Sequence, residues 1–175
     1  AVLVGAGTVV SDNPRLTVRM CEGPDPMRIV MDSRLRTPEN SHVIAPDTVF
    51  FCGRSASSDR IEAFRQRGAK VMVHNAENRY PLSEMLETLG AMAVNSVLVE
   101  GGSEIFTAFI RGKLCNRLEL FTAPVIIGAG VNSINDLGAE TIAGITRPHG
   151  FSWHDLGEGN MRFSAAMEVE PCLRD

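Results

Sequence analysis

Three stretches of the sequence place acidic, hydroxyl or guanidinium side chains directly after short apolar runs. In the first, Gly5 to Arg19, two glycines and Thr8 follow an apolar run, and Asp12 and Arg19 flank a turn. Glycine lets a ligand approach the backbone, and a helical turn from Thr8 would point N–H groups toward an anion. A strand–turn–strand connection with a solvated arginine explains the same residues, so both interpretations stay open.

The second stretch, Val97 to Glu104, joins an acid to two glycines. Glu100 ends an apolar run, and Gly101 and Gly102 lead into Ser103, which can cap a helix or donate to an oxygen. Ligands of open α/β sheets bind at the carboxyl ends of strands, where glycine leaves room for a pyrophosphate. The stretch lacks the GxGxxG of the Rossmann fingerprint, and an ordinary strand-to-helix turn is the alternative.

The third stretch, residues 32–38, places the hydroxyl of Ser33 and the guanidinium groups of Arg34 and Arg36 in one loop. Arginine offers a planar fork of donors that suits a phosphate. Residues 52–55 (CGRS) repeat the pattern after the next apolar run. Each loop alone fits a solvated polar loop, but three such loops at strand ends indicate a shared ligand rim.

Short apolar runs alternate with helical patterns, and these elements must position the three loops. The expected strands are Ala1–Val4, Met27–Asp32, Thr48–Cys52, Lys70–His74 and Ser96–Glu100. The expected helices are Asp59–Arg67 with Ser58 as its cap, an apolar pattern from Leu82 to Leu89 that Gly90 stops, and Ser103 to Gly112. Continuous apolar runs suit strands buried on both faces, and this alternation predicts a mostly parallel sheet with helices on both faces.

The C-terminal part changes character after an expected strand, Leu118–Ala123. A loop-rich stretch covers Gly128–His149. The runs Phe151–Leu156 and Met161–Glu170 then flank Gly157-Glu158-Gly159-Asn160, which is typical of a β-hairpin. We expect an antiparallel edge that closes the sheet.

Composition narrows the possible functions. The 175 residues suit one domain, 1–175, and the net charge of −4 comes without a basic stripe that would indicate nucleic-acid binding. The four cysteines form no CxxC pair or Cys/His cluster, so we expect no metal and a reducing, cytoplasmic setting. No signal peptide, membrane-spanning run or Gly-x-Ser-x-Gly elbow occurs in the sequence.

Four motifs taken together resemble a known family. They are GAGTVVSDNPRLTVR, RIVMDSRLRTP, VLVEGGSEIFTAFI and LELFTAPVIIGAG, in that order. They resemble the reductase domain of the bifunctional riboflavin-biosynthesis deaminase–reductase and the related stand-alone archaeal and fungal reductases. The resemblance implies a dihydrofolate-reductase-like α/β fold and a homodimer. It also implies NADPH-dependent reduction of 5-amino-6-(5-phosphoribosylamino)uracil to its ribitylamino product, with hydride reaching ribose C1′.

The resemblance also implies site residues by position. Substrate contacts would come from Leu16, Arg19 and Glu100, with Arg19 at the substrate phosphate. Cofactor contacts would come from Thr8, Asp12, Ser33, Gly102, Ser103, Glu104, Ile105, Phe106, Thr107 and Ala108. Our own candidates for the 2′-phosphate are Arg34, Arg36, Arg54 and Ser55. No proton donor is assigned.

Two departures from the family pattern leave alternatives open. The family has a strand and a helix before the position of Ala1, so we expect a reductase domain that lacks both. The zinc-deaminase signature is absent from the sequence, which excludes deamination by this chain. The alternatives are a non-catalytic NADP-binding or dimerisation fragment of a bifunctional enzyme, and another dihydrofolate-reductase-like reductase.

Overall fold

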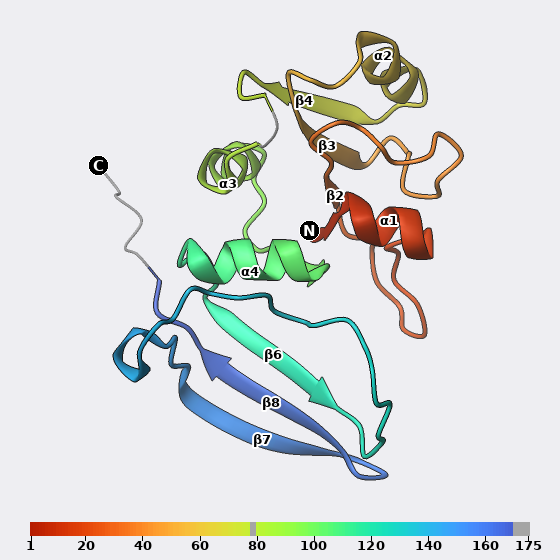
Figure 1. The fold of residues 1–175 in the computed structure, drawn as a ribbon. Helices are drawn as coiled ribbons and strands as arrows, with labels where there is room; N and C mark the ends of the chain where they lie inside the picture. The colour runs from red at the N-terminus through yellow and green to blue at the C-terminus, as the bar shows by residue number, and fades with distance from the viewer. Residues whose placement is uncertain (78–79, 170–175) are drawn as a thin grey trace. The chain divides into compact units, whose positions relative to one another are not determined.

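The structure, a computed structural model, describes residues 1–77 and 80–169. The chain divides into two compact units, Ala1–Ile105 and Phe106–Asp175, and each unit contains its own β-sheet (Figure 1). They are called the first and the second unit below. The assignment of residues 1–175 to one reductase domain stays a prediction.

The first unit is built on a five-stranded parallel sheet. Its strands are β1 (Val2–Gly5), β2 (Arg28–Met31), β3 (Thr48–Gly53), β4 (Lys70–His74) and β5 (Leu98–Gly101). The strand order is β4-β3-β2-β1-β5, and every pair is parallel. The chain therefore runs outward from β1 to β4 and returns to the other side of β1 with β5. The topological switch point, where ligands of such sheets bind, lies between β1 and β5.

Both faces of this sheet are covered, as the apolar runs predict. Neighbouring residues of a strand point to opposite faces. On one face Phe50 meets Phe64 of helix α2 (Ser58–Gln66), with ring centres 4.9 Å apart. On the other face Phe51 meets Tyr80, which lies just before helix α3 (Leu82–Ala91), at 4.8 Å. The mostly parallel sheet with helices on both faces is confirmed.

The two remaining α-helices of the described residues each follow a glycine-containing turn. Helix α1 (Ala6–Asp12) follows Gly5, and helix α4 (Ser103–Arg111) follows Gly101 and Gly102. The strand–turn–strand alternative for the first stretch is therefore wrong, because α1 follows β1 directly. Helix α4 begins at the expected Ser103 and ends just before Gly112. None of the helices in the described part of the chain is long and apolar enough to cross a membrane.

Two predicted helix ends are corrected. Ser58 is the first residue of α2 rather than its cap; the N-cap is Ser57, in an extended conformation. Helix α3 passes through Gly90 and ends at Ala91, because Met92 still donates to the carbonyls of Thr88 and Leu89. The left-handed residue that ends this helical run is Ala93, with φ of 61°.

The second unit holds an antiparallel sheet in the order β6-β8-β7. Its strands are β6 (Arg117–Thr122), β7 (His149–Gly157) and β8 (Asn160–Ala166), and a short 3-10 helix, η1 (Ile142–Gly144), lies in the loop between β6 and β7. The hairpin is confirmed, with Gly157 and Gly159 at φ of 86° and 77°. Glu170, the predicted end of the last strand, lies outside the described residues.

The expectation that the hairpin closes the parallel sheet is wrong for the residues that the structure describes. Strand β8 has β6 on one side and β7 on the other, so both of its edges are already paired. Strands β6 and β7 form the two edges of this second sheet, and neither pairs with a strand of the first unit. The hairpin therefore builds a sheet of its own.

Candidate cofactor and substrate site

The two glycine-containing turns meet at the switch point of the parallel sheet. Val4 of β1 pairs with Gly101 of β5, so the chain leaves both strands at the same edge of the sheet. A Cβ atom on Gly102 would lie 3.6 Å from the Thr8 hydroxyl oxygen. Thr8 and Gly102, which sequence reasoning assigned to two separate motifs, therefore face each other.

Packing accounts for Gly5, and backbone conformation accounts for Gly101. A Cβ atom on Gly5 would meet the Ile105 side chain at 3.0 Å, which is tighter than ordinary contact. Gly101 has φ of 135°, where residues with side chains are rarely found. At Gly102 an added Cβ would have one neighbour within 4 Å among the described residues beyond the adjoining ones, the Thr8 hydroxyl, at an ordinary contact distance. The space beside Gly102 is therefore open to a ligand.

The end of α1 is held by the loop that follows β2. Asn13 adopts a left-handed conformation with φ of 42°, and its side-chain oxygen accepts the His42 N–H at 2.9 Å. The His42 Nδ1 atom also lies 3.1 Å from the Asn13 carbonyl oxygen. Asp12 is exposed beside this anchor and accepts a hydrogen bond from Ser11 at 2.7 Å. Sequence reasoning missed His42, because an isolated histidine in a loop gives no local signal.

Leu16 and Arg19 lie in the same loop but differ in their surroundings. Leu16 is half-buried, packs against the core cluster of the first unit and has φ of 54°. Arg19 is exposed. The Val18 N–H donates to the Asp25 carboxylate at 2.9 Å, which holds the loop beside Arg19. Leu16 thus anchors the loop, and Arg19 presents a guanidinium to solvent.

The loops after β2 and β3 are joined by their backbones. The Gly53 N–H donates to the Ser33 carbonyl at 2.9 Å, and Ser33 is half-buried there. Arg54 forms an ion pair with Glu77 at 3.0 Å, and the Ser55 hydroxyl donates to the Glu77 carbonyl at 2.5 Å. Two of the candidates for the 2′-phosphate are thus engaged by Glu77, in the loop after β4, whereas Arg36 is an exposed arginine of the loop after β2.

The residues of the predicted cofactor-binding stretch 102–108 differ in their exposure to solvent. Glu104 is exposed in the first turn of α4, and Glu100 is exposed near the end of β5. Thr107 is buried, and its hydroxyl accepts the Asn135 N–H at 2.8 Å in the second unit. Packing within the protein is therefore an alternative to cofactor contact as the role of buried residues of this stretch such as Thr107.

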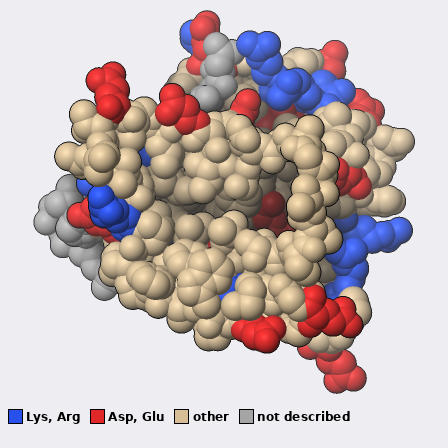
Figure 2. Space-filling model, turned by 60° about the horizontal axis from the view of Figure 1, so that its bottom comes forward, with Lys and Arg blue, Asp and Glu red and all other residues tan. Residues whose placement is uncertain are grey.

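The charges and thiols near the loops leave few reactive groups. Burial, with the Asp32 charge adding to it, raises the pKa of the Cys52 thiol to about 11, so this thiol is protonated and unreactive near neutral pH. Within residues 1–77 and 80–169 no group of His, Cys, Asp and Glu could hold a metal ion. On the face in Figure 2, side chains of both charges are spread among uncharged residues.

Comparison with known proteins identifies the family. The sequence matches the family described as the RibD C-terminal domain over residues 1–159. The chain belongs to the RibD C-terminal domain family. The resemblance stated from the four motifs is therefore confirmed.

Two relatives show how much of a longer protein this family domain covers. The riboflavin biosynthesis protein RibD of Actinobacillus pleuropneumoniae is 36% identical over 146 residues, which is 81% of this chain and 39% of the relative. The 2,5-diamino-6-ribosylamino-4(3H)-pyrimidinone 5′-phosphate reductase of Methanothermobacter thermautotrophicus is 35% identical over 133 residues. These residues make up 73% of this chain and 61% of that relative. The chain thus spans less than two thirds of each relative.

Solved structures confirm the dihydrofolate-reductase-like fold. Acinetobacter baumannii RibD superposes with a TM-score of 0.75 at 22% identity, covering 95% of this chain and 46% of that one. A pyrimidine reductase-like protein from Corynebacterium diphtheriae superposes with a TM-score of 0.75 at 18% identity. The match covers 97% of this chain and 76% of that one. At these identities the likeness concerns the fold.

Proposed function

We propose that this chain binds NADPH and reduces 5-amino-6-(5-phosphoribosylamino)uracil to the ribitylamino product of riboflavin biosynthesis. The observation that carries the proposal is the open space beside Gly102, opposite the Thr8 hydroxyl, at the switch point of the parallel sheet. The names of the relatives, a riboflavin biosynthesis protein and a pyrimidinone phosphate reductase, support it. The whole relatives are longer than this chain.

The cofactor-binding part of the proposal uses the two turns and their helices. Gly102 directly precedes α4, and a pyrophosphate beside it would gain from the positive end of the helix dipole. Thr8, Asp12 and Ser33 surround the same edge of the sheet and supply hydroxyl and carboxylate groups. When bound, the nicotinamide supplies the hydride.

The substrate-binding part uses the exposed groups of the same edge. Arg19 binds the substrate phosphate through its guanidinium fork, and Leu16 holds the loop that carries it. Glu100 contacts the substrate from the end of β5. These residues hold ribose C1′ near the nicotinamide, so their contribution is mainly one of orientation.

A homodimer is the assembly that we propose for the chain. The second unit exposes large apolar side chains on its sheet and loops, among them Phe121, Trp153 and Ile126. Phe121 is level with Arg162 of β8 and Trp153 with Phe163, so the exposed aromatic side chains lie on both faces of this sheet, and burying such side chains would favour association of two copies. Light scattering after gel filtration tests this assembly, and a monomer at micromolar concentration contradicts it.

The function is tested by binding and turnover together. We expect NADPH to bind more tightly than NADH, and NADPH oxidation to require the ribosylamino-pyrimidine phosphate rather than dihydrofolate. Binding without turnover would instead indicate a cofactor-binding fragment of a bifunctional enzyme. Turnover with dihydrofolate would indicate a different reductase of the same fold.

Variants of the loop after α1 test the assignment of the substrate phosphate. Arg19→Ala should raise KM for the substrate about 10–100-fold, as for a lost charged hydrogen bond, and change the Kd for NADPH less than about twofold. The matched control is Arg15→Ala, which removes another exposed arginine of the same loop. A parallel loss of cofactor and substrate affinity in Arg19→Ala would contradict the separate roles.

A further inference from the structure

The loop after β2 has a buried side and an exposed side. Asp32, Leu35 and Thr37 are buried, and Arg34 and Arg36 between them are exposed. Leu35 is fully buried with φ of 50°, so the chain turns into the core at this residue. The alternation of buried and exposed residues places both arginine side chains on the outer side.

Asp32 holds this loop from inside. Its backbone carbonyl accepts the Leu35 N–H at 3.0 Å, and its carboxylate accepts the Thr37 N–H at 2.7 Å. Hydrogen bonds from a backbone N–H to a buried carboxylate are among the stronger ones in proteins. The inner side of the loop is therefore fixed at both ends.

Arg60 of α2 holds the loop from the side. Its Nε atom donates to the Leu35 carbonyl at 2.5 Å, and its terminal nitrogen donates to the Thr37 carbonyl at 2.5 Å. Its guanidinium carbon also lies 5.4 Å from the centre of the Phe64 ring. Because the guanidinium is planar and rigid, the two bonds fix the positions of the carbonyls before and after Arg36. The direction of the Arg36 side chain is thereby restricted.

We propose that Arg60 is a positioning residue that orients Arg34 and Arg36 toward the 2′-phosphate of NADPH and so sets the preference for NADPH over NADH. Arg60 acts through the loop, since two of its nitrogens donate to backbone carbonyls of the loop and the third faces the Glu39 carboxylate at 3.5 Å. The inference rests on the proposed function, in which the loop after β2 meets the cofactor. NADH lacks the 2′-phosphate, so its affinity should hardly depend on this loop.

The test compares two arginines of the same helix. Arg60→Met keeps the apolar stem and removes both bonds to the backbone carbonyls, together with the exposed ion pair to Glu39. Arg65→Met is the matched control, because Arg65 also lies on α2 and donates to one backbone carbonyl, that of Val71, at 3.2 Å, away from the loop. If the released loop occupies its binding conformation about a tenth of the time, Kd for NADPH rises about tenfold. The Kd for NADH should change less than about twofold, and Arg65→Met should change neither Kd beyond that.

Each outcome decides the inference. Unchanged discrimination between the two cofactors in Arg60→Met overturns it, and so does an equal loss for both cofactors, which would assign Arg60 a structural role only. A wild-type chain that binds NADPH and NADH equally contradicts the proposed cofactor itself, so the two failures are distinguishable. Circular dichroism checks folding. If Arg60→Met is unfolded, Arg60→Lys, which keeps the charge but cannot bridge two carbonyls, should show a smaller shift in the same direction, and its absence overturns the inference.

Discussion

The sheets of the two units differ in the composition of their strands and sharply in burial. Strands β1 (VLVG) and β3 (TVFFCG) are mostly apolar, whereas β7 (HGFSWHDLG) mixes polar and apolar residues. In the first unit, Leu3, Ile29 and Phe50 are fully buried. In the second unit every residue of β7 is exposed, including Trp153. A parallel sheet needs cover on both faces, whereas an antiparallel sheet can leave one face open. The apolar core of the first unit therefore forms within that unit, whereas large apolar side chains of the second unit, such as Phe121 and Trp153, remain exposed.

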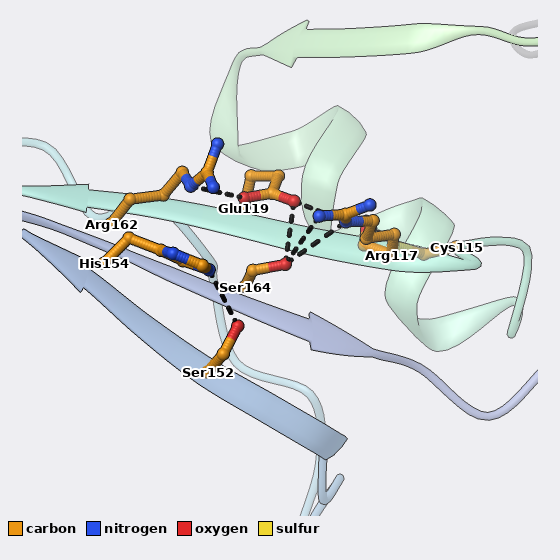
Figure 3. A network of polar contacts seen from close by, with 7 residues as sticks. All are labelled: Cys115, Arg117, Glu119, Ser152, His154, Arg162 and Ser164. Carbon is orange, nitrogen blue, oxygen red and sulfur yellow. Dashed lines mark hydrogen bonds and ion pairs between the residues drawn. The ribbon is translucent and has the colours of Figure 1, made fainter.

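The sheet of the second unit carries a cluster of cross-strand polar contacts. In Figure 3, Glu119 of β6 lies between the guanidinium groups of Arg117 and Arg162, with Ser164 beside it. The Glu119 carboxylate lies 2.5 Å from Arg117 and 3.7 Å from Arg162, and it accepts the Ser164 hydroxyl at 2.9 Å. Ser152 and His154 of β7 form a separate contact at 2.9 Å. Cross-strand pairs of this kind stabilise a sheet that buries little apolar surface.

The largest expected effect comes from truncating an aromatic side chain in each unit. Phe50→Ala should lower the free energy of unfolding by about 3–5 kcal/mol, because it leaves a cavity against Phe64. Phe121→Ala in the second unit should change it by about 0.5 kcal/mol or less, because Phe121 is 66% exposed. Urea unfolding followed by circular dichroism measures both. An equally large loss of unfolding free energy in Phe121→Ala would contradict this difference between the units. If that loss also depended on protein concentration, a second copy of the chain would be covering the Phe121 side chain.

The next largest effect is a loss of NADPH affinity, and it should distinguish Gly102, beside the proposed ligand space, from Gly130 in the second unit. Gly102→Val should weaken NADPH binding by more than about thirtyfold, or about 2 kcal/mol, because the side chain fills the proposed pyrophosphate space. The protein should stay folded, since within the described part of the chain a Cβ atom there meets Thr8 alone, at an ordinary contact distance of 3.6 Å. The control is Gly130→Val in the second unit, where a Cβ atom has no neighbour within 4 Å.

The two ends of the same turn should differ in what they bind. Glu100→Gln should leave the Kd for NADPH within about twofold and reduce substrate use, because Glu100 is exposed at the end of β5 rather than beside the open space. Cofactor titrations of both variants make the comparison. Normal NADPH binding by Gly102→Val, or loss of NADPH by Glu100→Gln as severe as that of the glycine variant, would show that the two roles are wrongly divided.

The smallest effect concerns the acid of the second unit. Partial burial raises the pKa of Glu119, but hydrogen bonds from Ser164 and Arg117 and the charges of Arg117 and Arg162 lower it more, so it lies below its usual value. The folded state then gains stability above the usual glutamate pKa, and this gain is lost as pH falls through the lowered pKa. Glu119→Gln should therefore be slightly less stable than wild type near neutral pH, and the difference should shrink in acid. Melting temperatures from pH 7 downward test this, and a constant difference would contradict it.

Several features could be predicted from the sequence because their causes are local. Apolar runs of four to six residues between turn residues predicted strands such as β3 and β4 within a residue or so of their ends. The glycines after Glu100 predicted the start of α4, and the Gly157 to Asn160 turn predicted the hairpin. The four motifs predicted the family and hence the fold, because they carry the same turns in the same order.

The tertiary structure decided which local features meet. Only the strand order brings Thr8 opposite Gly102. Strand β5 pairs with one side of β1, whereas β2, β3 and β4 lie on the other side of β1. Only packing shows that Arg54 is engaged by Glu77 and that Arg60 holds the loop of Arg36. The sequence by itself determined the strands, the glycine turns and the family. The partners of each side chain depended on contacts between distant segments, which no local pattern of residue types records.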